Sequence, residues 1–230
     1  SIVNLPLLAH DPPGGHLALY EPGRPCAPLT LANVAGFLEL SMGLSAWKAV
    51  SGSRWSLRMN PSSGNLHPTE THLVLPDMKG CDAGIYHYSP LQHALERRAE
   101  LTSELWRTAV AHLGCEGFLA GLTSIFWRES WKYGERAFRY CNHDVGHALA
   151  ALRFAANLFG WQLTCLTGLS DAAVETVLGL RRTHYPSLDE EHPDLLCLVH
   201  AGGQHSLSQT LPAELVAAFD TIHFAGRPNP

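Results

Sequence analysis

The stretch Arg58-Met59-Asn60-Pro61-Ser62-Ser63-Gly64-Asn65-Leu66-His67-Pro68-Thr69-Glu70 gathers a guanidinium, two serine hydroxyls, two amides and an imidazole in one short segment. A strand-like run, residues 71–75, follows directly. Such a polar loop must give its backbone N–H and C=O groups partners. Gly64 allows a ligand to approach the backbone closely, and Pro61 and Pro68 stiffen the two ends. The segment therefore predicts a loop that binds one polar ligand.

The composition predicts a globular protein with one domain, because the chain has 230 residues and 46% of them are hydrophobic. A net charge of −5 without a Lys/Arg-rich run argues against a nucleic-acid binder. We find no apolar run of the ~18–20 residues that a membrane span needs, and the N-terminal residues do not resemble a signal peptide. The six cysteines are widely spaced with no Cys-x-x-Cys pair, so we expect reduced thiols in a cytoplasmic protein.

The ends of the chain predict how it is organised. It lacks an initiator Met, and residues 226–230 resemble a linker, so we expect a fragment or one piece of a longer polypeptide. Residues 1–28 are rich in proline and glycine and predict an extended arm. The domain is expected over residues 29–222, followed by a tail over residues 223–230.

Hydrophobic periodicity and capping residues predict a set of helices and strands. Helices are expected at residues 31–42, 105–113, 171–178 and 212–219, with Thr102 or Ser103 and Ser170-Asp171 as N-terminal caps and Gly43 and Gly114 as ends. Strands are expected at residues 71–75, 85–88, 161–166 and 195–199. The longest helix, residues 135–159, would form the spine of the domain. The order predicts an α+β fold in which helices, one of them long and central, flank a mixed β-sheet.

A second conspicuous segment is Trp131-Lys132-Tyr133-Gly134-Glu135-Arg136-Ala137-Phe138-Arg139-Tyr140, followed by Asp144-Val145-Gly146-His147-Ala148. Together with residues 58–70 it resembles the nitroreductase superfamily. The branch that it resembles most is the azoline dehydrogenases, which oxidise thiazoline and oxazoline rings in modified peptides. The resemblance implies an α+β nitroreductase-like fold and an FMN cofactor. It extends from about residue 29 to residue 203 and is dense over residues 45–76 and 131–149.

The resemblance implies that Lys132 and Tyr133 serve catalysis. Dehydrogenation requires hydride loss to flavin N5 and proton loss to a base. A lysine desolvated beside a cofactor can have a lowered pKa and act as that base, and a neighbouring tyrosine can donate or shuttle a proton. The alternative is a solvated Lys-Tyr pair at the start of a helix.

The same resemblance implies a set of cofactor-binding residues. Arg58 would place its charge near flavin N1–C2=O, the alternative being a surface salt bridge. Gly202 and Gly203 follow a strand and could offer N–H groups to the phosphate, although a plain turn explains them almost as well. Members of the superfamily usually hold the phosphate with a pair of arginines near the N-terminus, and no counterpart precedes Arg24. Either the pair lies outside this sequence, or another cation such as Arg136 or Arg139 substitutes for it. The remaining predicted contacts all lie in the loop: Asn60, Ser62, Ser63, Gly64, Asn65 and His67.

Several other positions have two explanations. Gly146 costs about 1 kcal/mol relative to alanine in a helix, so we expect a close contact there with the cofactor or a partner helix. The residues Ala150-Ala151 stand where many relatives carry Gln-Asn. His143 and His147 have a zinc-binding spacing but no evident third ligand, so no metal is predicted. Four tryptophans are expected in the core or an interface rather than a substrate cage: Trp47, Trp55, Trp127 and Trp131.

These observations lead to one function and its alternatives. The leading hypothesis is an FMN-dependent oxidoreductase that acts on a small molecule or a modified peptide, with azoline dehydrogenation as its sharper form. An NAD(P)H-dependent nitro or quinone reductase is the looser form. The second hypothesis is a non-catalytic half-site domain, completed by a homodimer or by a second like domain in the same polypeptide. A flavin-binding sensor is a third. The substrate, electron donor and oligomeric state do not follow from the sequence.

Overall fold

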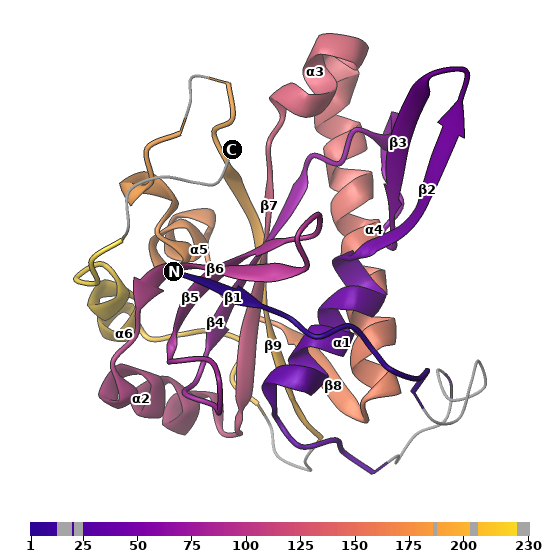
Figure 1. The fold of residues 1–230 in the computed structure, drawn as a ribbon. Helices are drawn as coiled ribbons and strands as arrows, with labels where there is room; N and C mark the ends of the chain where they lie inside the picture. Colours follow the sequence, from indigo (N-terminus) through magenta and orange to yellow (C-terminus); the bar gives the residue numbers. More distant parts are fainter. Residues whose placement is uncertain (13–19, 21–24, 186–187, 203–206, 225–230) are drawn as a thin grey trace.

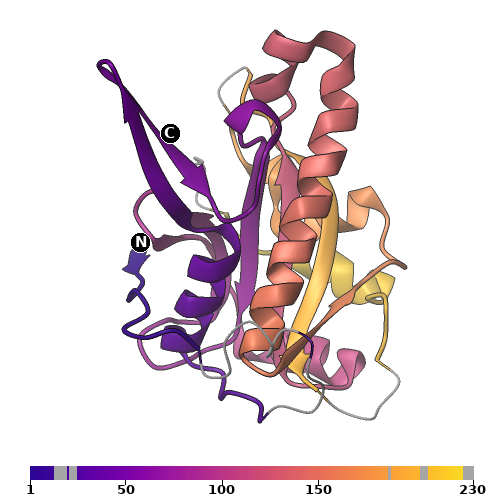
Figure 2. The same ribbon diagram turned by 90° about the vertical axis from the view of Figure 1, so that its right-hand side faces the viewer.

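The structure, a computed structural model, describes residues 1–12, 20, 25–185, 188–202 and 207–224. Its main sheet has seven strands in the order β1-β6-β5-β4-β7-β9-β8. Their bounds are β1 Ile2–Asn4, β4 Thr69–Leu75, β5 Gly84–Ser89, β6 Ala94–Glu100, β7 Gly117–Ser124, β8 Trp161–Cys165 and β9 His192–Ala201. A separate hairpin, β2 Leu44–Val50 and β3 Ser53–Arg58, projects away from this sheet (Figures 1 and 2).

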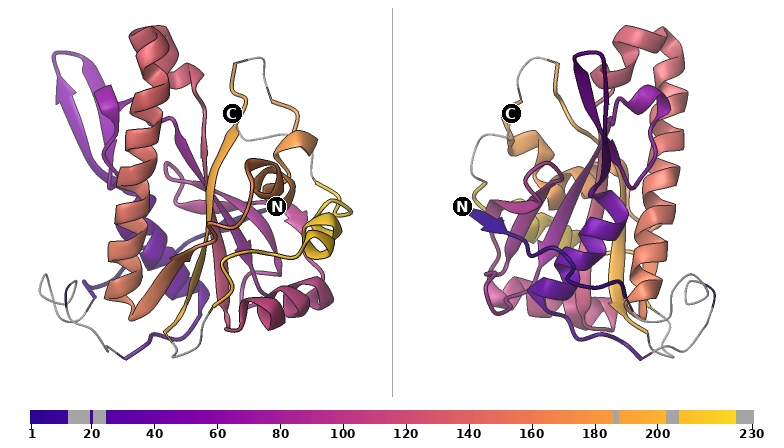
Figure 3. Two further views of the ribbon diagram at one scale, coloured as in Figure 1. Left: turned by 180° about the vertical axis from the view of Figure 1, so that it is seen from behind. Right: turned by 45° about the vertical axis from the view of Figure 1, so that its right-hand side comes forward.

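Helices cover both faces of the sheet (Figures 1 and 3). One face packs against α1 Leu31–Met42 and α4 Ala137–Leu158, and the other against α2 Ser103–Leu113, α5 Asp171–Leu178 and α6 Ala213–Phe219. A short helix, α3 Trp127–Tyr133, leads through the 3-10 turn Gly134–Arg136 into α4. This arrangement confirms the predicted α+β class with its long central helix. The strand directions are more uniform than in the mixed sheet that we expected, since every pairing among the described residues is antiparallel.

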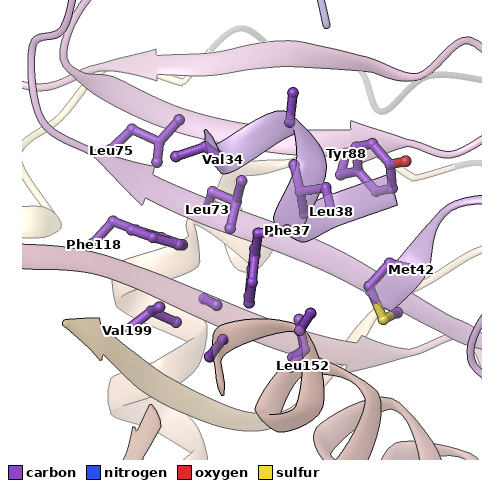
Figure 4. Packing of buried hydrophobic residues seen from close by; sticks show 14 of the residues in the cluster. Val34, Phe37, Leu38, Met42, Leu73, Leu75, Tyr88, Phe118, Leu152 and Val199 are labelled. Carbon is purple, nitrogen blue, oxygen red and sulfur yellow. The ribbon is translucent and has the colours of Figure 1, made fainter. Parts of the chain in front are cut away.

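The core between α1, α4 and the sheet is fully packed. Phe37 on α1 lies between the sheet and α4, with its ring centroid 5.5 Å from that of Phe118 on β7 (Figure 4). Leu73 of β4 and Leu152 of α4 close the same cluster, and all four side chains are inaccessible or almost so. Because burial of each such side chain contributes about 1.5–3 kcal/mol, α4 is held firmly against the sheet. The residues of α4 that form part of the site described below are therefore held in a fixed position relative to the sheet.

Capping explains why several helices begin where predicted. The hydroxyls of Thr30, Thr102 and Ser170 each accept from the backbone N–H three residues on. Gly114 ends α2 in the left-handed conformation, with φ of 84°. Among the described residues, none of the helices is long and apolar enough to cross a membrane.

Strands β6 and β7 and the hairpin escaped the sequence prediction. All eight residues of β7 are buried, so the strand has no alternation of polar and apolar residues to reveal it. The charged residues of β6 are typical of a surface segment, although Glu96 and Arg98 are in fact buried in a polar cluster. Residues on both sides of the predicted domain, 29–222, also contact it. Ile2–Asn4 pairs with β6, and Phe224 is buried and bridges Ala99.

Candidate functional site

The loop between β3 and β4 folds back on itself through left-handed backbone conformations. Gly64, Asn65 and His67 have φ angles of 64°, 60° and 49°, which non-glycine residues seldom adopt. The Asn65 amide Nδ2 donates to the Ser56 carbonyl at 2.9 Å, and Asn65 Oδ1 lies 2.7 Å from His67 Nε2. The His67 backbone N–H donates to Ser62 Oγ at 2.8 Å. These bonds hold the strained turn in one conformation.

A buried carboxylate joins the loop to α4. The Ser63 backbone N–H donates to Asp144 Oδ1 at 3.0 Å, and its hydroxyl donates to the same oxygen at 3.3 Å. Asp144 is fully buried. The side chains of Ser62, Ser63 and Asn65, which we expected to contact a ligand, thus brace the loop. Gly64, which has no side chain, leaves its backbone open to approach by another group.

Lys132 and Tyr133 approach the loop at Gly64. A Cβ atom added to Gly64 would lie 2.7 Å from Lys132 Nζ and would collide with Tyr133 Oη. A larger residue at this position would have to displace the ends of these two side chains. The pair lies at the end of α3, where we had considered the start of a helix. Lys132 Nζ also lies 5.3 Å from the centroid of the Tyr133 ring. The structure thus brings together two segments that are far apart in the sequence.

A second carboxyl group lies under this contact. Glu129 of α3 is fully buried, and neither of its carboxyl oxygens has a hydrogen-bond partner among the described residues. Burial is the largest of the effects that together raise the pKa of Glu129 to about 7, and the neighbouring charge of Asp144 acts in the same direction. Two buried carboxyl groups in contact share one proton. Because the pKa of Glu129 is raised and Asp144 accepts from Ser63, we infer that Glu129 is the carboxyl group that stays protonated near neutral pH.

On its other side the loop borders a polar cavity of about 570 Å³, whose walls include Arg58 and His67. Arg58 Nη1 donates to the Thr69 carbonyl at 3.2 Å. Arg128 Nη1 donates to the His67 carbonyl at 2.9 Å and to the Glu70 carboxylate. Two arginines therefore fix the end of the loop and bring positive charge to the cavity wall.

A half-buried histidine lies between two buried carboxylates in the wall of this cavity. His87 Nε2 lies 2.7 Å from Glu70 Oε2, and its Nδ1 lies 2.9 Å from Glu96 Oε2. Burial lowers the pKa of His87, but the hydrogen bonds to the two carboxylates outweigh that effect and raise it to about 10. Both ring nitrogens therefore carry protons at neutral pH. The sequence did not indicate a role for His87, Glu70, Glu129 or Asp144, although Glu70 and Asp144 lie in the two quoted segments, because nothing local signals contacts made across the fold.

Comparison with known proteins places this geometry in a family. Residues 28–193 match the Nitroreductase family. The chain belongs to the nitroreductase family. It is 27% identical over 166 residues to MJ1384 of Methanocaldococcus jannaschii, a protein described as a nitroreductase. This match covers 70% of this chain and 79% of MJ1384. It is 31% identical over 132 residues to the trifolitoxin-processing protein TfxB of Rhizobium leguminosarum bv. trifolii, covering 52% of this chain and 35% of TfxB.

Solved structures share the nitroreductase fold. A protein of this family from Anabaena variabilis superposes with a TM-score of 0.61 and 24% identity, covering 74% of this chain and 34% of that one. A chain of the E. coli microcin synthetase McbBCD, in complex with truncated pro-MccB17, superposes with a TM-score of 0.59 and 21% identity, covering 77% and 66%. The chain thus spans about a third of the length of TfxB and of the cyanobacterial protein.

Not all of the predicted family site residues lie at the loop. Gly202 follows β9, whose first residue, His192, is paired through Ser124 to Thr69 beside the loop. Ten strand residues separate the two ends, which corresponds to about 30 Å at the usual rise per residue. Gly203 lies outside the described residues. Arg136 is exposed in the turn before α4.

The remaining predicted positions lie on the surface of this nitroreductase-family chain. A Cβ added to Gly146 would meet no atom within 4 Å among the described residues, so no contact within this part of the chain explains the glycine. His143 and His147 are exposed on α4. The described residues contain no group of three or more His, Cys, Asp or Glu side chains arranged to hold a metal. The four tryptophans are 38–59% exposed, which leaves an interface as their expected place.

Proposed function

We propose that this chain is an FMN-dependent oxidoreductase in which hydride moves between the flavin and an organic substrate. The observation that carries the proposal is the contact of Lys132 and Tyr133 with Gly64. It unites a candidate proton-transfer pair with the loop that resembles an FMN-binding segment. Family membership supports the oxidoreductase class. The contact of Lys132 and Tyr133 with Gly64 supports a reaction site beside the loop.

The residues around the loop fit a polar cofactor. Asn60 is buried, and neither its Nδ2 nor its Oδ1 has a hydrogen-bond partner among the described residues. The same holds for His67 Nδ1 and Thr69 Oγ1. Buried polar atoms are normally paired, so these groups are available to a ligand or to water. We propose that Asn60, the Gly64 backbone and the free N–H groups of Arg58 hold the flavin.

Lys132 and Tyr133 would move the proton. When bound, FMN supplies an acceptor or donor of hydride. Lys132 Nζ would accept the proton from the substrate carbon or nitrogen, and Tyr133 Oη would hold the substrate heteroatom by a hydrogen bond. The buried Glu129–Asp144 pair keeps both ends of this arrangement in place, because Asp144 holds Ser63 of the loop and Glu129 lies one turn before Lys132.

We propose an azoline ring in a modified peptide as the substrate. Support comes from the 31% identity to TfxB, a trifolitoxin-processing protein. The microcin synthetase, whose structure contains a truncated pro-peptide, shares only the fold. Reduction of nitro compounds or quinones by NAD(P)H is the looser alternative for the same site.

A second candidate function is a half-site domain. The separation of Gly202 from the loop favours it, because a mononucleotide held by both would need a second chain or a second like domain. Phe138 and Phe154, on the solvent side of α4, are 68% and 48% exposed, and Trp131 of α3 is 59% exposed. Aromatic side chains are enriched in protein–protein interfaces. A homodimer would cover them and bring a second loop to the site.

The test begins with the purified protein and added FMN. We expect the protein to bind FMN, and Lys132→Ala and Tyr133→Phe to retain it while losing at least about 100-fold in turnover, the range typical of general acid–base groups. Turnover is measured as loss of two hydrogen atoms from a thiazoline-containing peptide by mass spectrometry. Lys79→Ala, at an exposed lysine before β5, is the matched control.

Three outcomes separate the hypotheses. Flavin binding with loss of peptide oxidation in both variants supports the proposed mechanism. Flavin binding with full turnover in Lys132→Ala and Tyr133→Phe refutes the role of this pair. A protein that remains colourless and does not bind FMN, alone and as a purified dimer, refutes the enzyme and favours the half-site domain.

A further inference from the structure

Two cysteines face each other at the edge of the main sheet. Cys165 is the last residue of the edge strand β8, and the register pairs it directly with Cys197 of β9. Their sulfur atoms are 3.4 Å apart, and both are free thiols. This pair is on neither of the segments that form the proposed active site. It therefore needs an explanation of its own.

The register places this pair at a position where a disulfide can close. The next residue, Leu166, donates its N–H to the Leu196 carbonyl at 2.9 Å. In an antiparallel ladder hydrogen-bonded and non-hydrogen-bonded pairs alternate, so Cys165 and Cys197 form a non-hydrogen-bonded pair with Cα atoms about 4.5 Å apart. That separation falls within the range of about 4.4–6.8 Å found in disulfides. Bond formation thus needs rotation of two side chains and little backbone movement.

The two thiols differ in access. Cys165 is half-buried at the sheet edge, whereas Cys197 is fully buried in the neighbouring strand. An attacking thiol must be reached by an oxidant, and a resolving thiol need only reach the first sulfur. We propose that Cys165 and Cys197 are a redox-active pair, with Cys165 attacking and Cys197 resolving, that closes a reversible disulfide between β8 and β9. This inference is independent of the proposed flavin chemistry.

The proposed reaction is thiol–disulfide exchange with a small-molecule disulfide such as oxidised glutathione. The Cys165 thiolate attacks one glutathione sulfur, the S–S bond breaks, and one glutathione thiolate leaves. The Cys197 thiolate then attacks Cys165 Sγ and displaces the second glutathione. In total, two protein thiols are oxidised to one disulfide, and one glutathione disulfide is reduced to two thiols, which take up the two protons.

The electrostatic environment favours this order of attack. The Cys197 thiol donates a hydrogen bond to Cys165 and lowers the pKa of Cys165 to about 7, with burial opposing and Arg153 assisting. The same hydrogen bond, together with burial, raises the pKa of Cys197. Cys165 is therefore the thiol with the larger thiolate fraction at neutral pH.

The experiment equilibrates the whole protein in glutathione buffers from fully reduced to fully oxidised, and then alkylates the free thiols. Trypsin cuts after Arg153, Arg181 and Arg182, so the two cysteines fall in separate peptides, residues 154–181 and 183–230. We expect these peptides to be joined in oxidising buffer and separated by dithiothreitol. Half-buried Cys115, in its own tryptic peptide, is the internal control and should remain alkylated.

The variant Cys197→Ser tests the roles of the two thiols. Without its resolving partner, Cys165 should accumulate a mixed disulfide with glutathione, on the order of tenfold more than in the wild-type protein. Full alkylation of both cysteines in wild-type protein even in oxidised glutathione refutes the proposal, and so does an equal amount of mixed disulfide in both proteins. The wild-type peptide map needs no variant, so a folding defect in Cys197→Ser leaves the test intact. Neither measurement depends on flavin or substrate.

Discussion

The substitution Glu129→Gln should stabilise the protein at neutral and alkaline pH. Glutamine keeps the size of the side chain, but it cannot ionise. The pKa of Glu129 is raised from 4.5 to about 7. Between these values the folded chain binds a proton that the unfolded chain has lost, so stability falls as pH rises through this window. The pKa of Glu129 differs by about 2.5 units between the folded and unfolded chains. At 1.36 kcal/mol per unit, ionisation of Glu129 therefore lowers the free energy of unfolding by at most about 3 kcal/mol.

The assay is urea unfolding of both proteins from pH 4 to 8.5. The quantity of interest is the difference between the two free energies of unfolding, because titrations elsewhere in the chain cancel in it. We expect this difference to be smallest near pH 4.5 and to grow in favour of Glu129→Gln by up to about 3 kcal/mol at pH 8. Glu135→Gln, which changes an exposed glutamate in the turn before α4, controls for the loss of a carboxyl group.

A pH-independent difference between Glu129→Gln and the wild type would refute the reasoning, since it would mean that Glu129 does not hold a proton in the folded state. The opposite slope would mean that Glu129 is ionised and stabilised by a cation. Amide hydrogen exchange at Ser63 gives a second readout. Above pH 7 its protection should fall in the wild-type protein, whose two carboxylates then repel each other, and should stay constant in Glu129→Gln.

Two further predictions concern the loop and the cavity. Gly64→Ala should lower FMN affinity at least about tenfold, measured by flavin fluorescence, because an alanine at φ of 64° is strained and its Cβ would displace Lys132 and Tyr133; unchanged affinity would show that the contact is dispensable. His87→Gln should lower the free energy of unfolding in urea at pH 7 by up to about 3–5 kcal/mol, because it removes the cation that lies between two buried carboxylates, of which Glu70 keeps Arg128. The pKa of His87 is raised to about 10, so its stabilisation is complete below pH 6.5 and lost as pH rises through 10; a cost that persists at pH 11 would contradict the assignment.

The sequence predicted best those elements whose signals are local. Thr102 and Gly114 bracket α2 as expected, because a side-chain cap and a left-handed glycine act within a few residues. The apolar stripe of α4 predicted its span to within two residues at each end. Strand β7 gave no such signal, because it is buried on both faces and its glycines are placed for close packing. A Cβ on Gly121 would lie 2.7 Å from the Leu178 side chain.

The candidate site, too, was predictable only where its signals are local in the sequence. The composition of the loop indicated a binding role, but not which atoms would remain free to bind. The hydroxyl of Ser63 is used by Asp144, 81 residues away, and Glu129 acquires its raised pKa only when α3 and α4 meet. Contacts at such separations depend on the packing of the whole chain, so a single sequence without relatives for comparison does not reveal them.

The distribution of the predicted cofactor residues bears on whether one chain makes one site. Arg58, Asn60 and Gly64 lie at one end of the main sheet, and Gly202 lies at the other, about 30 Å away along β9. Lys132 and Tyr133 join the first group. If the phosphate of a mononucleotide needs the second group, then the loop of one chain and the glycine of another must face each other. The open position of Gly146 on the exposed side of α4 leaves room for a second helix there. A partner helix at Gly146 would cover part of the exposed face of α4, so we expect cofactor affinity to depend on protein concentration if association completes the site.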